Sequence, residues 1–72
     1  MLSTLRNGDR GKVKEILSGS DLVKRLAAMG IVVGSCLSVV SNPDRGPILV
    51  ESNGKRVAMG RGMAEKIAIE VV

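Results

Sequence analysis

The stretch Arg25-Leu26-Ala27-Ala28-Met29-Gly30-Ile31-Val32-Val33-Gly34 contains both the end of a helix and the approach to a strand. Gly30 can adopt the left-handed backbone conformation that ends a helix, and Ile31 just beyond it can fold back onto Leu26. These residues predict a hydrophobic C-cap, which replacement of Gly30 is expected to break. After Gly34 the chain is expected to continue as a strand.

A short helix is predicted over residues 21–29, directly upstream of this corner. Ser20 can accept a hydrogen bond from the free amides at the helix start, and Asp21 places a negative charge in the first turn, where the helix dipole favours it. Three apolar residues then recur at helical spacing: Leu22, Leu26 and Met29. The helix is therefore expected to bury one face.

The clearest local prediction is a hairpin over Ile48 to Met59, because Asn53-Gly54 is the preferred centre of a two-residue type I′ turn. The turn fixes the register of the two strands, which should pair Ser52 with Lys55, Glu51 with Arg56, Val50 with Val57 and Ile48 with Met59. This register gives an apolar face and one charge-matched pair.

The rest of the chain predicts three further strands and one short turn. The predicted elements are strands at Gly11 to Leu17, Ser35 to Val40 and Lys66 to Val72, with a single helical turn at Arg61 to Glu65. In the first of these strands, Val13 and Ile16 are three residues apart, so they can share one face only if the strand contains a bulge. Residues 1–72 are thus expected to form one mainly β domain, a small SH3-like barrel of about five strands with one short helix after the first strand. Closure of the barrel would protect the strand edges.

Composition excludes several classes of function. Hydrophobic residues make up 44% of the chain but none is aromatic, so platforms that stack bases or dock polyproline cannot form. The net charge of +4 comes from eleven basic and seven acidic residues that are interspersed, which makes nucleic acid an unfavoured partner. The first ten residues do not resemble a signal peptide, and the uncharged run over residues 26–43 is interrupted by Gly, Ser and Asn, so a cytoplasmic protein without a membrane span is expected.

The sequence predicts no catalytic residue, no cofactor and no metal site. One cysteine and no histidine exclude a disulfide framework, a zinc knuckle and a Cys/His nucleophile pair, and the carboxylates are spread along the chain. A soft copper site could be drawn from Cys36, Met29, Met59 and Met63. Packing explains these methionines better, because Met29 and Met59 lie on predicted core faces.

A protein interface is the remaining expectation. Lys24 and Arg25 are predicted on the outward face of the helix, with further arginines on neighbouring loops or strands, and arginine is enriched at interfaces. The candidate partner-binding residues are Lys24, Arg25, Arg45, Arg56 and Arg61.

The sequence resembles the FeoA family over nearly its whole length. The resemblance is carried by Leu5, Gly8, Gly11, Val13 and Ile16, by the pattern Arg-Leu-x-x-Met-Gly-Ile-x-x-Gly from Arg25 to Gly34, and by Leu37, Val39, Gly46-Pro47, Gly54, Val57-Ala58, Ala64, Ile67 and Ile69. Two departures are Val33, where the family commonly has proline, and Gly60-Arg61-Gly62, where it is commonly more helical.

The resemblance implies an SH3-like fold and a non-enzymatic accessory role in ferrous iron uptake, as an adaptor that binds the cytoplasmic, nucleotide-binding region of the FeoB-type permease. An alternative is a regulatory module similar to the C-terminal SH3-like domain of metal-dependent transcriptional repressors. The chain lacks a helix-turn-helix, and its Met1 lies only a few residues before the first motif, which favours a freestanding protein. A nucleic-acid-binding barrel is a third hypothesis, and the sequence leaves self-association open.

Overall fold

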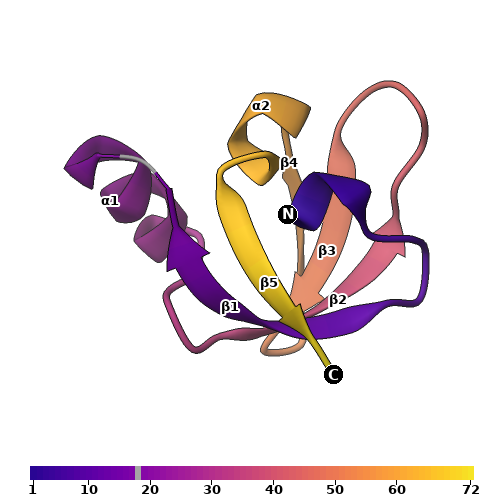
Figure 1. The fold of residues 1–72 in the computed structure, drawn as a ribbon, viewed down its shortest axis with the longest axis horizontal. Helices are drawn as coiled ribbons and strands as arrows, with labels where there is room; N and C mark the ends of the chain where they lie inside the picture. The colour runs from indigo at the N-terminus through magenta and orange to yellow at the C-terminus, as the bar shows by residue number, and fades with distance from the viewer. Residues whose placement is uncertain (18) are drawn as a thin grey trace.

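Five antiparallel strands form one strongly bent sheet in the order β4-β3-β2-β1-β5 (Figure 1). The computed structural model describes residues 1–17 and 19–72. Its elements are a 3-10 turn η1 (Leu2–Thr4), β1 (Arg10–Ile16), α1 (Ser20–Ala28), β2 (Cys36–Ser41), β3 (Ile48–Ser52), β4 (Lys55–Met59), α2 (Arg61–Ala64) and β5 (Ile67–Val71). The predicted mainly β fold with one short helix after the first strand is confirmed.

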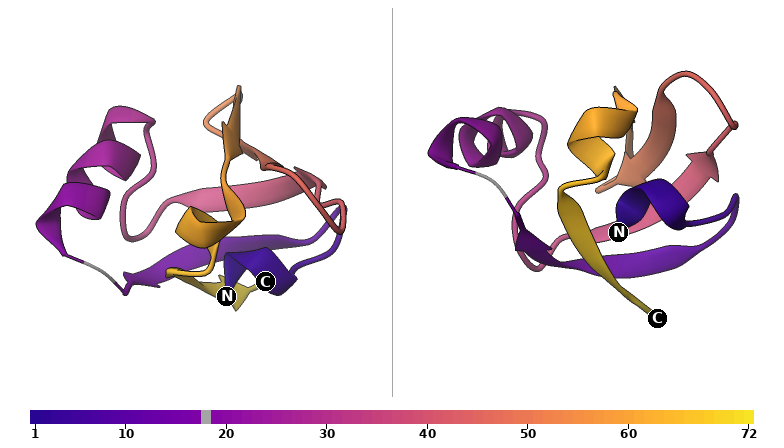
Figure 2. Two further views of the ribbon diagram at one scale, coloured as in Figure 1. Left: turned by 90° about the horizontal axis from the view of Figure 1, so that it is seen from above. Right: turned by 45° about the horizontal axis from the view of Figure 1, so that its top comes forward.

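The predicted closure of the barrel is wrong, because the sheet stays open within the described residues. β4 and β5 are its two edges and do not pair with each other. η1 packs beside β5 and against α2 (Figure 2). These two helical turns therefore lie where β4 and β5 would pair in a closed barrel. Leu2 of η1 and Ala64 of α2 are fully buried there. The apolar surface is therefore covered without joining the edges.

The β3–β4 hairpin confirms the predicted register at all four predicted pairs, from Ser52 with Lys55 to Ile48 with Met59. Asn53 and Gly54 have φ angles of 53° and 76°, as a type I′ turn requires. Glu51 and Arg56 are cross-strand neighbours, but no ion pair within 4.0 Å joins them. Register here follows from the turn and the apolar face.

The bulge predicted in the first strand is confirmed, since the β1–β5 register shifts between Val13 and Glu15. Gly11 serves a different purpose in the same strand. A Cβ placed on it would collide with the Ile69 side chain and lie 2.8 Å from the Glu70 carbonyl oxygen. Gly11 therefore lets β5 pack closely across β1.

The predicted C-cap of α1 is confirmed in detail. Gly30 has a φ of +84°, its N–H donates to the Ala27 carbonyl at 2.9 Å, and the Ile31 N–H donates to the Leu26 carbonyl at 2.8 Å. Both Leu26 and Ile31 are fully buried. These two hydrogen bonds, together with the buried side chains of Leu26 and Ile31, form a Schellman motif, which turns the chain back toward the sheet.

The predicted start of α1 needs correction. Ser20 is the first helical residue, and the N-cap position is held by Gly19, whose backbone is extended. Among the residues that the structure describes, no side chain caps the helix start, because the N-cap residue is a glycine and Ser20 already lies inside the first turn. The helix also ends at Ala28, with Met29 as the C-cap.

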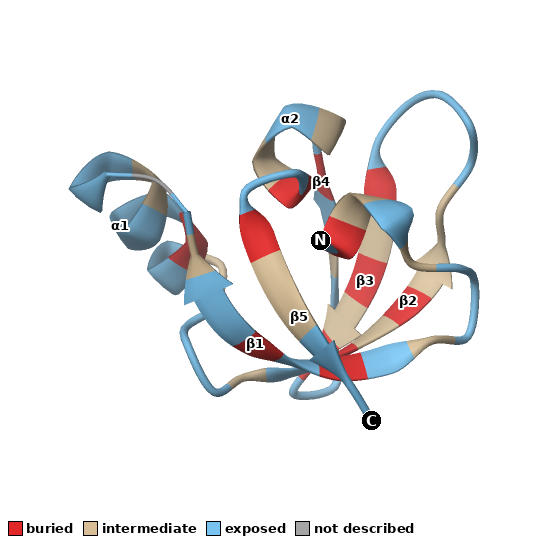
Figure 3. Ribbon diagram, viewed as in Figure 1, coloured by how far each residue is buried: buried red, intermediate tan, exposed pale blue. Residues whose placement is uncertain are grey.

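The core lies in the concave side of the bent sheet (Figure 3). It is built from aliphatic residues, Met59 and Ala64, as the composition requires: Leu2, Val13, Leu26, Ile31, Leu37, Val39, Ile48, Val50, Met59, Ala64 and Ile67. Met29 was predicted on the core face and is half-buried at its margin. In the part of the chain that the structure describes, no helix is long and apolar enough to cross a membrane.

Candidate functional site

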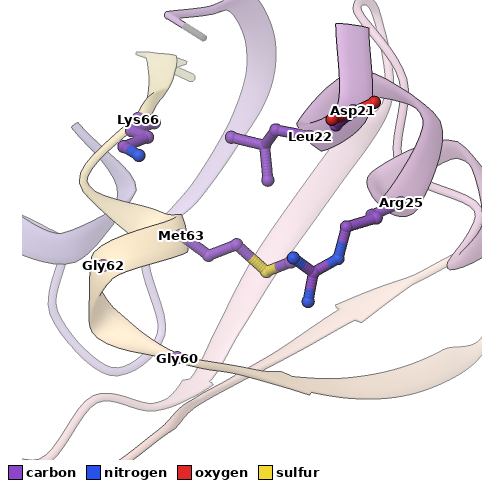
Figure 4. A pocket seen from close by; sticks show the side chains of 7 residues that line it. All are labelled: Asp21, Leu22, Arg25, Gly60, Gly62, Met63 and Lys66. Carbon is purple, nitrogen blue, oxygen red and sulfur yellow. The ribbon is translucent and has the colours of Figure 1, made fainter. Parts of the chain in front are cut away.

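An open groove separates α1 from α2 and encloses about 550 Å³. It is lined by Asp21, Leu22 and Arg25 of α1, by Gly60, Gly62 and Met63 at α2, and by Lys66 just before β5. Figure 4 shows Leu22 pointing into this space and the side chains of Met63 and Arg25 reaching toward each other from opposite walls. We refer to these seven residues as the α1–α2 groove.

The groove exists because α1 stands apart from the sheet (Figure 1). Its C-terminal end is anchored by the buried Leu26 and the cap residue Ile31, whereas Leu22, one turn earlier, is only half-buried. Residues at positions i and i+4 share one helix face, so Leu22 continues the buried face of Leu26 outward into the groove. The apolar face of α1 thus extends beyond the part that the core buries, and Leu22 at its outer end stays partly exposed.

The groove carries a small positive excess. Arg25 and Lys66 contribute two positive charges and Asp21 one negative charge, which leaves +1 (2 − 1). No ion pair within 4.0 Å is formed among residues 1–17 and 19–72, so Arg25 is not neutralised by Asp21 one turn away. Apolar Leu22 and Met63 are therefore flanked by cations that have no acidic partner.

Of the five predicted partner-binding residues, only Arg25 lines the α1–α2 groove. Arg25 lines the α1–α2 groove, while the neighbouring Lys24 is exposed on α1 and does not line it. Arg45 is exposed in the loop between β2 and β3, and Arg56 is exposed on β4. Helical geometry explains the first separation, because residues adjacent in sequence point about 100° apart around a helix axis.

Arg61 is engaged inside the protein. Its guanidinium donates from Nη1 and Nη2 to the Asn42 side-chain oxygen at 2.9 and 2.8 Å, and Nη1 also lies 3.4 Å from the Gly46 carbonyl oxygen. The Asn42 amide nitrogen donates in turn to the carbonyls of Ser3 and Leu5. This Asn42–Arg61 clasp ties α2 to the end of β2 and to η1, and so fixes one wall of the groove.

Of the seven groove residues, only Arg25 is predicted from the sequence as a contact residue, and the Asn42–Arg61 clasp is not predicted. The sequence predicts Leu22 on the buried face of the helix, Met63 in a possible soft metal site and Lys66 at the start of the last strand, and none of these predictions indicates a groove. Only the apolar spacing of Leu22 pointed to this surface. Asn42 lies outside the predicted strands, and its bonds to residues more than 30 positions away have no local signal.

Cys36, Met59 and Met63 lie in different parts of the fold. Cys36 is exposed on β2 beside a second cavity of about 350 Å³, Met59 is buried in the core, and Met63 lines the α1–α2 groove. Within the described ranges, no three His, Cys, Asp or Glu residues are grouped as metal ligands would be.

Comparison with known proteins agrees with this fold. The family model described as the FeoA domain matches residues 1–71. Fe(2+) transport protein A of Methanocaldococcus jannaschii is 39% identical over 69 residues, which cover 96% of this chain and 83% of the relative. The crystal structure of an iron uptake regulatory protein, FeoA, superposes with a TM-score of 0.91 at 32% identity, covering 99% of this chain and 93% of that one. A manganese-dependent transcriptional repressor matches with a TM-score of 0.87 at 28% identity, over 99% of this chain and 40% of the repressor. The chain therefore belongs to the FeoA family.

Proposed function

We propose that this chain is a non-enzymatic, cytoplasmic accessory protein of ferrous iron uptake, which binds the cytoplasmic region of a FeoB-type permease through the α1–α2 groove. Family membership supports the accessory role. The observation that carries the choice of surface is the groove itself, in which apolar side chains and unpaired cations lie between two helices.

The chemistry of the groove favours a protein partner. Leu22 and Met63 offer apolar surface, and the flexible methionine can adapt its shape to an inserted side chain. Arg25 and Lys66 flank that surface and can pair with acidic groups at the rim. The groove thus suits a segment with an apolar anchor residue between acidic neighbours. The Asn42–Arg61 clasp would hold α2 in place while the partner binds.

Two charge reversals on α1 test this proposal, because they change the net charge equally. Arg25→Glu places an acid in the groove, whereas Lys24→Glu changes a residue outside it. We expect Arg25→Glu to weaken binding of the permease's cytoplasmic region by about tenfold or more, equivalent to about 1.4 kcal/mol, with Lys24→Glu close to wild type. Calorimetric titration measures both constants.

Each alternative result has a defined meaning. Equal losses for Lys24→Glu and Arg25→Glu would show that net charge, and not the groove, governs binding. Unchanged affinity for both would place the contact elsewhere on the molecule. Absence of any complex with the wild-type chain, with and without guanine nucleotide, would overturn the adaptor role.

A second candidate function is that of a regulatory module. It is favoured by the similarity to the manganese-dependent transcriptional repressor, which this chain matches over 40% of the repressor's length. In that case the chain would act beside a DNA-binding half. Sequencing of the coding region tests this directly, because the regulatory role requires a DNA-binding domain encoded in the same reading frame.

A further inference from the structure

The two edges of the sheet differ in how they are protected. β5 has η1 packed beside it, and its pairing with β1 is interrupted by a bulge. β4 pairs with β3 over all five of its residues without a register shift, and no other strand in the described residues pairs with its outer side. Figures 1 and 2 show β4 as the last strand of the sheet, with its C-terminal end leading into α2.

The backbone groups that β4 leaves free can be assigned from its register. The pair that flanks a two-residue turn is hydrogen-bonded, here Ser52 with Lys55, and such pairs alternate with non-hydrogen-bonded ones. Arg56 and Ala58 therefore belong to non-hydrogen-bonded pairs, so their N–H and C=O groups point away from β3. Both residues are exposed. β4 thus presents two donors and two acceptors at strand spacing.

We infer that β4 accepts an extended acidic segment of a partner protein as an added sixth strand, through the outward backbone groups of Arg56 and Ala58. Addition of a strand to an exposed edge is a general mode of peptide recognition, in which main-chain bonds supply affinity and side chains supply selectivity. The inference deepens the proposed function and rests on it for the identity of the protein that carries the segment.

The charges of the residues around β4 favour an acidic segment as the added strand. Lys55 and Arg56 lie on the edge strand, and Arg25 and Lys66 line the groove beyond its end. The described acids beside them are Asp21 in the groove, Glu51, which pairs with Arg56 across the hairpin, and Glu65 before Lys66, which leaves an excess of one positive charge (4 − 3). A second copy of this chain would bring another Lys55 and Arg56 to the same edge, and like charges oppose pairing. An acidic strand is attracted instead, and beyond Ala58 it can pass Gly60 into the α1–α2 groove.

The test uses the isotope-labelled full chain and a short synthetic peptide in which Val and Glu alternate. We expect binding with a dissociation constant below about 1 mM, and slower hydrogen exchange at the Arg56 and Ala58 amides, because both gain acceptors. A matched peptide in which Lys replaces Glu should not bind. The same acidic peptide with N-methyl groups on the amides that face β4 should lose binding, since its donors are removed.

Ala58→Pro provides the test on the protein side. Its missing N–H faces the open edge, where proline is tolerated in strands, so the amide spectrum should otherwise remain that of the folded chain. We expect at least about tenfold weaker binding of the acidic peptide and of the permease region. If Ala58→Pro does not fold, the N-methylated peptide decides the question on the wild-type chain.

The possible outcomes separate this inference from the proposed function. Permease binding that is equal for wild type and Ala58→Pro would overturn strand addition while leaving the adaptor role intact. Peptide binding by wild type without permease binding would support the edge site and overturn the adaptor role. Equal binding of acidic and lysine peptides, unchanged exchange at Arg56 and Ala58, or peptide-induced dimerisation of the chain would overturn the inference.

Discussion

At the scale of single residues, Gly11 is required because two backbones approach closely. A methyl group on this residue would meet the Ile69 side chain and the Glu70 carbonyl. We predict that Gly11→Ala lowers the free energy of unfolding by about 1–3 kcal/mol through overpacking, as measured by urea denaturation. Gly62→Ala is the matched control, because its added methyl group meets nothing within 4 Å and it lies in a helix. Equal stability of Gly11→Ala and wild type would contradict this explanation.

Gly30 is required for a different reason, its left-handed backbone. There is open space around its Cβ position, but its φ is +84°. We predict that Gly30→Ala destabilises the fold by about 1–2 kcal/mol, and that Gly30→Asn costs less because asparagine tolerates this conformation. Thermal unfolding of the two variants measures the difference. Identical melting temperatures for both variants would rule out backbone conformation as the cause.

The roles of these two glycines differ in how well the sequence predicts them. The role of Gly30 could be predicted because its neighbours Leu26 and Ile31 encode the cap locally. The role of Gly11 could not, because the obstructing atoms belong to residues almost sixty positions later. In the candidate site Arg25 was predicted as a contact residue, whereas Lys66 and Met63 were not, since only the fold places them opposite α1.

At the scale of elements, the Asn42–Arg61 clasp determines where α2 lies. Arg61→Ala removes two hydrogen bonds to the Asn42 oxygen, at 2.9 and 2.8 Å. We predict a loss of about 1–2 kcal/mol in the free energy of unfolding, measured by urea denaturation. Arg56→Ala, which removes an exposed arginine from β4, should change stability by less than about 0.5 kcal/mol. If the two variants are equally stable, the clasp does not hold α2.

Elements encoded by adjacent residues were predictable, and those fixed by distant contacts were not. The hairpin around Asn53-Gly54 and the end of α1 follow from local turn and cap chemistry, and both are confirmed. Closure of the barrel was predicted from strand number and proved wrong. The N-terminal turn η1 packs beside β5 and against α2, and no pattern near Leu2 signals that placement.

At the scale of the whole molecule, the proposed contact surface runs from the open edge of the sheet to the groove between α1 and α2. The outer edge of β4 leads through Gly60 to the α1–α2 groove, and cations accompany it from Lys55 to Lys66. Sequence reasoning predicted that the chain acts by binding, from its lack of catalytic constellations. It could not locate the surface, because the groove forms between segments about forty residues apart.

An amide-shift titration of the isotope-labelled chain with the cytoplasmic region of the FeoB-type permease tests whether the α1–α2 groove is the surface that binds the permease. We predict that the largest shifts fall on residues of the α1–α2 groove, above all Leu22, Arg25, Met63 and Lys66. Shifts confined to the far side of the sheet, or no shifts with and without guanine nucleotide, would contradict it.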